Sequence, residues 1–139
     1  MDLAQLKTEL TTDPNAYGYA GKTDQEVADL LNLRRASIQV NKGPVTGMEF
    51  LDMFRDADFI AMNAAETAKV NMLLTAGGGM VDNASDVNIN LFKQALAAYP
   101  LTVARIESRR FRKGSRGEQL FGAGTVVTHL EVGQARLLP

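Results

Sequence analysis

Apolar side chains recur every three or four positions along most of the chain, which is the spacing of helices that bury one face. The predicted helices are a first one from Leu3 to the stop at Asp13-Pro14, then segments near 24–33, from 46, and at 57–75, 85–98, 102–113 and 129–137, with one or two turns at 116–121. Only residues 36–40 alternate as a strand does. The pattern predicts a mainly α fold, a bundle of about six short-to-medium helices with an extended loop and a C-terminal segment.

Four of these helices begin with the same signal. A Ser or Thr is followed three residues later by Glu, so that the two side chains can satisfy each other's free backbone amides. The pairs are Thr23 with Glu26, Thr46 with Glu49, Ser115 with Glu118, and Thr128 with Glu131. Four such pairs, each next to an apolar-periodic stretch, predict four helix starts.

The two helices predicted at 57–75 and 85–98 supply most of the expected core. In the first, the inward side is assigned to Phe59, Ile60, Ala64, Ala68, Met72 and Leu73. In the second, it is assigned to Val87, Leu91, Phe92, Ala95 and Leu96. Asp56 or Asp58 is expected to cap the helix at 57–75, and Gly77-Gly78-Gly79 is expected to end it.

The chain has 139 residues, which predicts one domain over 1–139 with one core. It has no cysteine and a single histidine, His129, so disulfide scaffolds, thiolate nucleophiles and Cys-ligated metals are excluded. A triad or a two-histidine metal site finds no partners at a recognisable spacing. Gly77-Gly78-Gly79 lacks the Lys-Ser or Lys-Thr of a phosphate cradle. We therefore expect no enzyme, no cofactor and no metal, and no stretch reads as a signal peptide or a membrane span.

Basic residues are concentrated in one segment. Residues 105–116 carry a net charge of +5 and the remainder of the chain −6. The basic residues of this segment are Arg105, Arg109, Arg110, Arg112, Lys113 and Arg116. We expect the segment 101–139 to be a basic helix followed by a C-terminal docking segment that contains Arg136, with the arginines exposed toward an anionic partner such as nucleic acid or an acidic protein.

A second interpretation of the basic segment is a solvated helix face with local pairs, such as Glu107 with Arg105 and Arg110. Sequence-specific DNA recognition is disfavoured, because no helix-turn-helix spacing is clear and Phe111 alone makes no stacking platform.

Two stretches resemble proteins from the structural modules of tailed bacteriophages and prophages. The first comprises residues 3–10 (LAQLKTEL), 13–14 (DP), 18–24 (GYAGKTD) and 28–32 (ADLLN), and the second comprises residues 115–132 (SRGEQLFGAGTVVTHLEV). Among such proteins, a helical chain of this length with a charged terminal segment resembles the head-to-tail connectors of the adaptor type.

The resemblance implies a non-enzymatic virion protein at the head–tail junction, made in the cytoplasm of the bacterial host. It implies a homo-oligomeric ring around the DNA channel that docks to the portal protein and contacts neighbouring neck or tail proteins. The basic residues and Arg136 would contact the portal or, non-specifically, the packaged DNA. The alternatives are a tail-completion, terminator or stopper protein of the neck, and a small DNA-binding accessory protein of packaging.

Overall fold

The computed structural model describes residues 1–139 and has nine helices and four short strands, with 56% of the residues in helices. The mainly α prediction is confirmed, but the fold is not a bundle of six helices. The chain divides into two compact units, unit 1 with residues 1–40 and 113–139 and unit 2 with residues 41–112. Where the length predicts one core, the structure has two hydrophobic clusters, one in each unit. None of the helices is long and apolar enough to span a bilayer.

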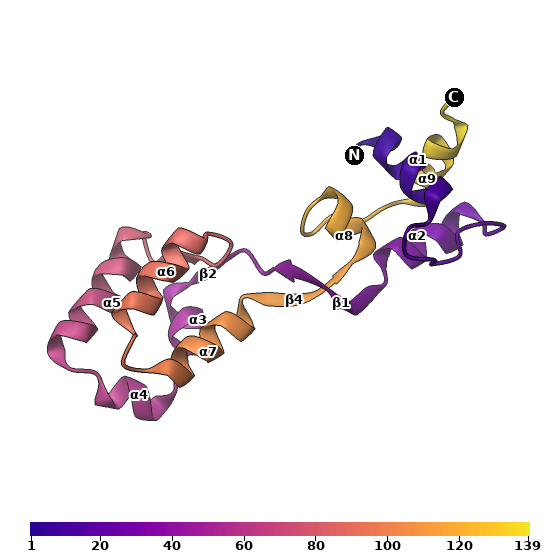
Figure 1. Cartoon of the computed structure of the whole chain (residues 1–139). Helices are drawn as coiled ribbons and strands as arrows, with labels where there is room; N and C mark the ends of the chain where they lie inside the picture. The colour runs from indigo at the N-terminus through magenta and orange to yellow at the C-terminus, as the bar shows by residue number, and fades with distance from the viewer. The chain divides into compact units, whose positions relative to one another are not determined.

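Unit 1 is assembled from both ends of the chain. Its elements are α1 (Leu3–Thr12), α2 (Asp24–Asn32), β1 (Arg34–Asn41), β4 (Phe111–Ser115), α8 (Arg116–Phe121) and α9 (His129–Leu137), of which β1 and β4 pair and each reach slightly past the boundary of the unit. Figure 1 shows α1, α2 and α9 gathered around one core. Gly114 of β4 leaves room for the side chains of Ile38 and Val40 of β1, because a Cβ at that position would lie 2.7 Å from a methyl group of Val40.

The loop between α1 and α2 is tied to the end of α1. The Asp13 carboxylate accepts hydrogen bonds from the amides of Tyr17 and Gly18, and Tyr19 is buried in the core. The side-chain amide of Asn32, the last residue of α2, bonds to the backbone of Val127, which precedes α9. It donates to the Val127 carbonyl at 2.7 Å and accepts from the Val127 backbone amide at 2.9 Å. The two bonds between Asn32 and Val127 connect the N-terminal half of unit 1 to its C-terminal half.

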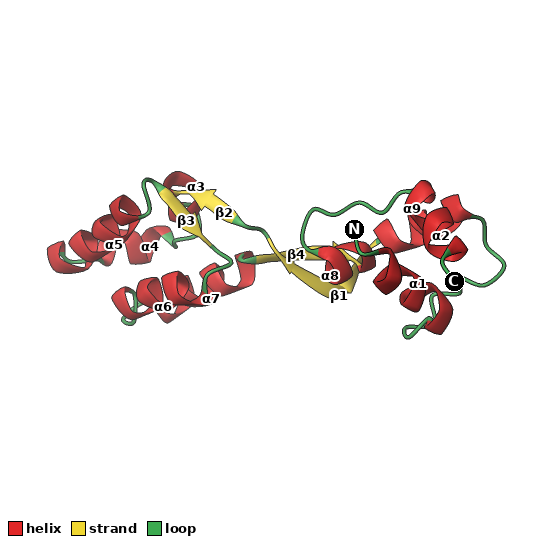
Figure 2. Ribbon diagram, turned by 90° about the horizontal axis from the view of Figure 1, so that it is seen from above, coloured by secondary structure: helices red, strands yellow, loops and turns green.

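Unit 2 is one continuous stretch of chain. Its elements are β2 (Pro44–Thr46), α3 (Gly47–Leu51), α4 (Asp56–Ala61), α5 (Ala64–Ala76), β3 (Met80–Asp82), α6 (Asp86–Ala95) and α7 (Pro100–Arg109). Strands β2 and β3 pair antiparallel with Val45 opposite Val81, and Figure 2 shows this ribbon beside α3. The core is formed by aromatic and aliphatic side chains, among them Phe50, Phe92 and Ile106.

All four predicted capping boxes are present at the starts of α2, α3, α8 and α9. A fifth box, which a search for Ser or Thr overlooks, joins Asn63 to Glu66 at the start of α5. It splits the long helix predicted at 57–75 into α4 and α5, with Met62 between them. Because the break changes the helical register, Phe59, Ile60 and Met72 are exposed, and their inward assignment was wrong.

The inward face predicted for α6 is confirmed at Phe92 and Leu96 and wrong at Val87 and Leu91. Ile89, Phe92 and Leu96 are buried, whereas Val87 and Leu91 are exposed. The basic helix is also shorter than predicted: α7 begins at Pro100 and ends at Arg109, and residues 111–115 form β4 instead of a last helical turn. The strand at 36–40 is confirmed within the longer β1.

The two neighbouring positions Leu91 and Phe92 give a test of the α6 register. We expect Phe92→Ala to lower the free energy of unfolding by about 3–5 kcal/mol, because it removes a fully buried ring from the core of unit 2. We expect Leu91→Ala to cost less than about 1 kcal/mol, because this side chain is 43% exposed. Urea unfolding followed by circular dichroism measures both, and equal losses would contradict the register.

The capping boxes also make stability depend on pH. Hydrogen bonds from the cap residue, first from its backbone amide and then from its hydroxyl, lower the pKa of Glu26, Glu49 and Glu131 below the ordinary value of 4.5. The folded state then binds fewer protons than the unfolded state in this range, so the free energy of unfolding falls as the pH drops below about 4.5. We expect the Glu26→Gln variant to retain the cap acceptor but to show a shallower loss of stability between about pH 5 and pH 3. Urea midpoints at several pH values measure this slope, and an unchanged slope would refute the role of Glu26.

Candidate functional site

The seven basic residues singled out by the sequence fall into both units. Arg105, Arg109, Arg110 and Arg112 belong to unit 2, and Lys113, Arg116 and Arg136 to unit 1. Arg105 and Arg109 lie on α7, and Arg110 is the C-cap of that helix. Arg112 and Lys113 lie on β4. Arg116 is the first residue of α8, and Arg136 lies on α9. They therefore lie on four different elements and do not form one basic helix.

Arg105 and Arg109 are the two that the structure brings together. They are four residues apart on α7 and share a face of that helix. Arg105 donates to the carbonyl of Phe54 at 3.3 Å, and Arg109 donates to the carbonyl of Asp52 at 3.1 Å. Both guanidinium groups thus satisfy carbonyl oxygens near the C-terminal end of α3, as cations commonly do at helix ends.

Arg110 is buried, which contradicts its assignment to an exposed contact surface. Its Nε donates to the Asn83 carbonyl at 2.9 Å, Nη2 to Asp86 at 2.6 Å and Nη1 to Glu107 at 3.3 Å. The Asp86 hydrogen bond is the main cause that raises the pKa of the guanidinium. A buried guanidinium requires acceptors for its N–H donors. Since Arg110 finds them in Asn83 and Asp86, it joins the end of α7 to the start of α6.

The Glu107 carboxylate connects this cluster to Lys93 on α6, whose Nζ lies 2.9 Å from Glu107 Oε1. The hydrogen bond from Lys93 and the one from Arg110 lower the pKa of Glu107. The local pairing of Arg110 with Glu107 that the sequence suggested is therefore present.

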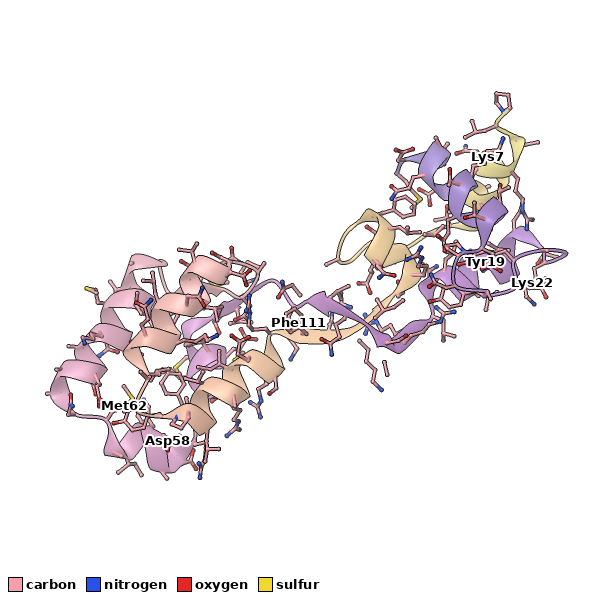
Figure 3. All side chains as sticks on the ribbon, in the orientation of Figure 1. Lys7, Tyr19, Lys22, Asp58, Met62 and Phe111 are labelled. Carbon is pink, nitrogen blue, oxygen red and sulfur yellow. The ribbon has the colours of Figure 1, made fainter.

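Arg116 is the second largely buried arginine. It forms two hydrogen bonds with Glu9 of α1, from Nε to Oε1 at 2.8 Å and from Nη2 to Oε2 at 2.6 Å. The hydroxyl of Tyr19, labelled in Figure 3, donates to the same carboxylate at 3.2 Å. Burial, followed by the charge of Glu9, raises the pKa of Tyr19. This cluster joins α1, α8 and the α1–α2 loop in the interior of unit 1.

Arg136 is exposed but engaged within unit 1. It pairs with Asp24 at the start of α2 and donates to the Lys22 carbonyl at 2.9 Å. Lys7, labelled in Figure 3, similarly donates to the carbonyl oxygens of Leu138 and Pro139 at 2.8 and 2.6 Å. These contacts fix the predicted docking segment against α1 and the loop that precedes α2.

The other candidates for chemistry are isolated. His129 is exposed at the first residue of α9. Asp58, labelled in Figure 3, does not cap α4 but accepts a hydrogen bond at 2.7 Å from Thr102, and Asp56 is the first residue of α4. No three His, Asp or Glu side chains are placed to hold a metal ion.

Exposed apolar side chains are the feature that sequence reasoning missed. Thirteen large hydrophobic residues are exposed, and several of those most exposed in unit 2, Met48, Ile60 and Met72, belong to helices. The signal that would have found two of them is the Asn63–Glu66 box, since it ends the register that placed Ile60 and Met72 inside. The exposed surface of unit 2 is therefore apolar as well as basic.

Comparison of the chain with protein-family models, with curated proteins and with solved structures found no match.

The contrast between Arg109 and its neighbour Arg110 tests the arginine clusters. We expect Arg110→Met to lower the free energy of unfolding by about 2–4 kcal/mol, because it removes the charged hydrogen bonds to Asp86 and Glu107 and the bond to the Asn83 carbonyl. Arg109→Met, the matched control, should change it by no more than about 0.5 kcal/mol, since the side chain is partly exposed. Urea unfolding of the two variants measures the difference, and a larger effect at Arg109 would contradict these roles.

Proposed function

We propose that this protein is a non-enzymatic structural protein of a tailed phage virion, located at the head–tail junction. It assembles there as a ring of identical copies that docks to the portal and joins head to tail around the DNA channel. The proposal combines the resemblance of residues 3–10, 13–14, 18–24, 28–32 and 115–132 to phage structural proteins with the apolar and basic side chains on the surface of unit 2.

The observation that carries this proposal is the set of exposed apolar side chains on a chain whose arginines are engaged internally. Ile60 is 82% exposed, and Met48 is 72% exposed. Exposed apolar clusters of this kind are typical of surfaces that another protein covers. The polar side chains, in contrast, are used in capping boxes and ion pairs, as Glu26 and Arg110 are. The surface therefore favours assembly over catalysis.

The internal pairing of Arg110, Arg116 and Arg136 changes which basic residues we assign to partners. Arg105 and Arg109 each donate one hydrogen bond to a backbone carbonyl, which leaves further N–H donors on each guanidinium for a partner. We therefore assign contact with the portal or with DNA phosphates to Arg105 and Arg109. Arg110 and Arg116 have structural roles within their units.

The alternative of a DNA-binding accessory protein uses the same two side chains. It differs in requiring binding to duplex DNA that weakens with salt, with a slope reduced in an Arg105→Ala and Arg109→Ala double variant. The terminator or stopper alternative differs in placing the chain on tails or at the neck without a direct portal contact.

Quantitative mass spectrometry of purified particles tests the location. We expect between a few and about a dozen copies per particle, retained on isolated heads, because a ring at the portal has a small fixed number of subunits. An Arg105→Glu and Arg109→Glu double variant should fold normally and yield heads that do not join tails. The control is the Arg34→Glu variant, which changes an exposed arginine of β1 that we assign to no partner.

Copies on isolated tails alone would move the protein to the terminator role. Absence from particles would refute the virion proposal and turn attention to the DNA-binding alternative.

A further inference from the structure

Unit 2 has two separate apolar hollows on its surface. The first, which we call the α3–α4 patch, has a volume of about 390 Å³ and is lined by Met48, Leu51, Asp52, Phe54, Asp56, Phe59 and Ile60. Its outer rim consists of the exposed side chains of Met48, Phe59 and Ile60. These side chains project from two short consecutive helices.

The second hollow, which we call the α5–α6 groove, has a volume of about 260 Å³ and is lined by Lys69, Met72, Leu73, Leu91, Gln94 and Ala95. A further hollow of about 190 Å³ shares Leu73 and Leu91 with it, so the groove continues toward β3. Met72 is 63% exposed at its edge, and a flexible thioether suits a surface that adapts to an inserted side chain. Figure 1 shows α4 below the α5–α6 pair, and the patch and the groove share no lining residue.

The charged side chains that line the two hollows have opposite signs, and the guanidinium groups of Arg105 and Arg109 lie beside the α3–α4 patch on the carbonyls of Phe54 and Asp52. Asp52 and Asp56 line the α3–α4 patch, both are exposed, and neither carboxylate takes part in a hydrogen bond or an ion pair. Lys69 lines the α5–α6 groove, is exposed, and its ammonium group is in no ion pair. A like-to-like contact between two α3–α4 patches would place unpaired carboxylates against each other, which is unfavourable. A contact between a patch and a groove pairs acid with base.

We propose that the α3–α4 patch of one copy docks into the α5–α6 groove of the next copy of this chain. Phe59 and Ile60 enter the groove beside Met72 and Leu91, and Asp56 approaches Lys69. The proposal deepens the proposed function and rests on it, because it names the contact that builds the ring. Two different surfaces of the same unit meet in such a contact, so it repeats head to tail and closes into a ring or extends as a filament.

Two variants of the full-length chain test this contact. Ile60→Glu breaks the patch and leaves the groove intact, and Met72→Glu breaks the groove and leaves the patch intact. Both positions are well exposed, so both variants should fold, which circular dichroism and thermal melting check. The matched control is Leu101→Glu, because Leu101 is 59% exposed on α7 and lines neither hollow.

In analytical ultracentrifugation, we expect the natural chain and Leu101→Glu to self-associate with rising concentration and each Glu variant to stay at 15.1 kDa. An equimolar mixture of Ile60→Glu and Met72→Glu should form a 1:1 dimer and nothing larger, because only one intact patch and one intact groove can meet. The charge-reversed pair tests the polar contact: Lys69→Asp and Asp56→Lys should each weaken association at least about tenfold, and the double variant should recover most of it.

Three results would overturn the proposal. A natural chain that stays monomeric up to about 1 mM leaves both hollows to a different partner. Glu variants that associate as the natural chain does place the interface elsewhere. A mixture that remains monomeric while the natural chain associates shows that like surfaces meet.

Failure of this contact and failure of the proposed function give different results. If Ile60→Glu still enters particles as a ring, the contact is wrong and the head–tail role stands. If the 1:1 dimer forms and the protein is absent from particles, the contact stands and the head–tail role is wrong.

Discussion

A guanidinium group removed from water must find acceptors for its N–H donors, and two arginines impose this requirement on the elements around them. Arg116 is satisfied by both oxygens of Glu9, a residue 107 positions away, and so fixes where α8 packs against α1. Arg110 is satisfied by the Asn83 carbonyl, Asp86 and Glu107, and so fixes the end of α7 against the start of α6. The remaining helices of each unit pack on cores that these two clusters help to define. A guanidinium left without its acceptors inside either unit would cost several kcal/mol, which is a large part of the stability of a small protein.

The same requirement separates the basic side chains by role. Those held inside a unit cannot also contact a partner, so the positive charge of residues 105–116 is only partly presented at the surface. What unit 2 presents in addition is apolar: side chains on α3, α4, α5 and α6 that no part of the unit covers. Apolar surface gives an assembly contact most of its free energy, whereas charged residues at its edge determine orientation and partner choice. Two carboxylates that line one hollow and a lysine that lines the other provide that orientation in this chain.

Local signals in the sequence predicted local structure well. Four capping boxes depend only on residues three apart, and all four begin helices, including the final one at 129–137. Predictions that depended on the register of a long helix failed where an unrecognised Asn63–Glu66 box interrupts it, and Ile60 and Met72 changed from core to surface. The acidic partners of the arginines could also be predicted only in part from neighbouring residues in the sequence. Glu107 is close enough in sequence to suggest a pair with Arg110, but Glu9 and Asp24 are distant in sequence from Arg116 and Arg136, and only the fold brings them together. The division into two cores was missed for the same reason, because the core of unit 1 depends on contacts of α1 and α2 with α9, which is distant in sequence.

The discontinuous composition of unit 1 determines the order in which the chain can fold during synthesis. Residues 1–40 leave the ribosome before unit 2, but their packing partners in α8 and α9 leave it only after unit 2. Unit 2 is continuous and has all of its core residues available once Arg112 has emerged. Because domains generally fold as units while the chain is being made, the middle of this protein folds before its beginning. In the interval, the apolar faces of α1 and α2 stay exposed until α9 packs against them.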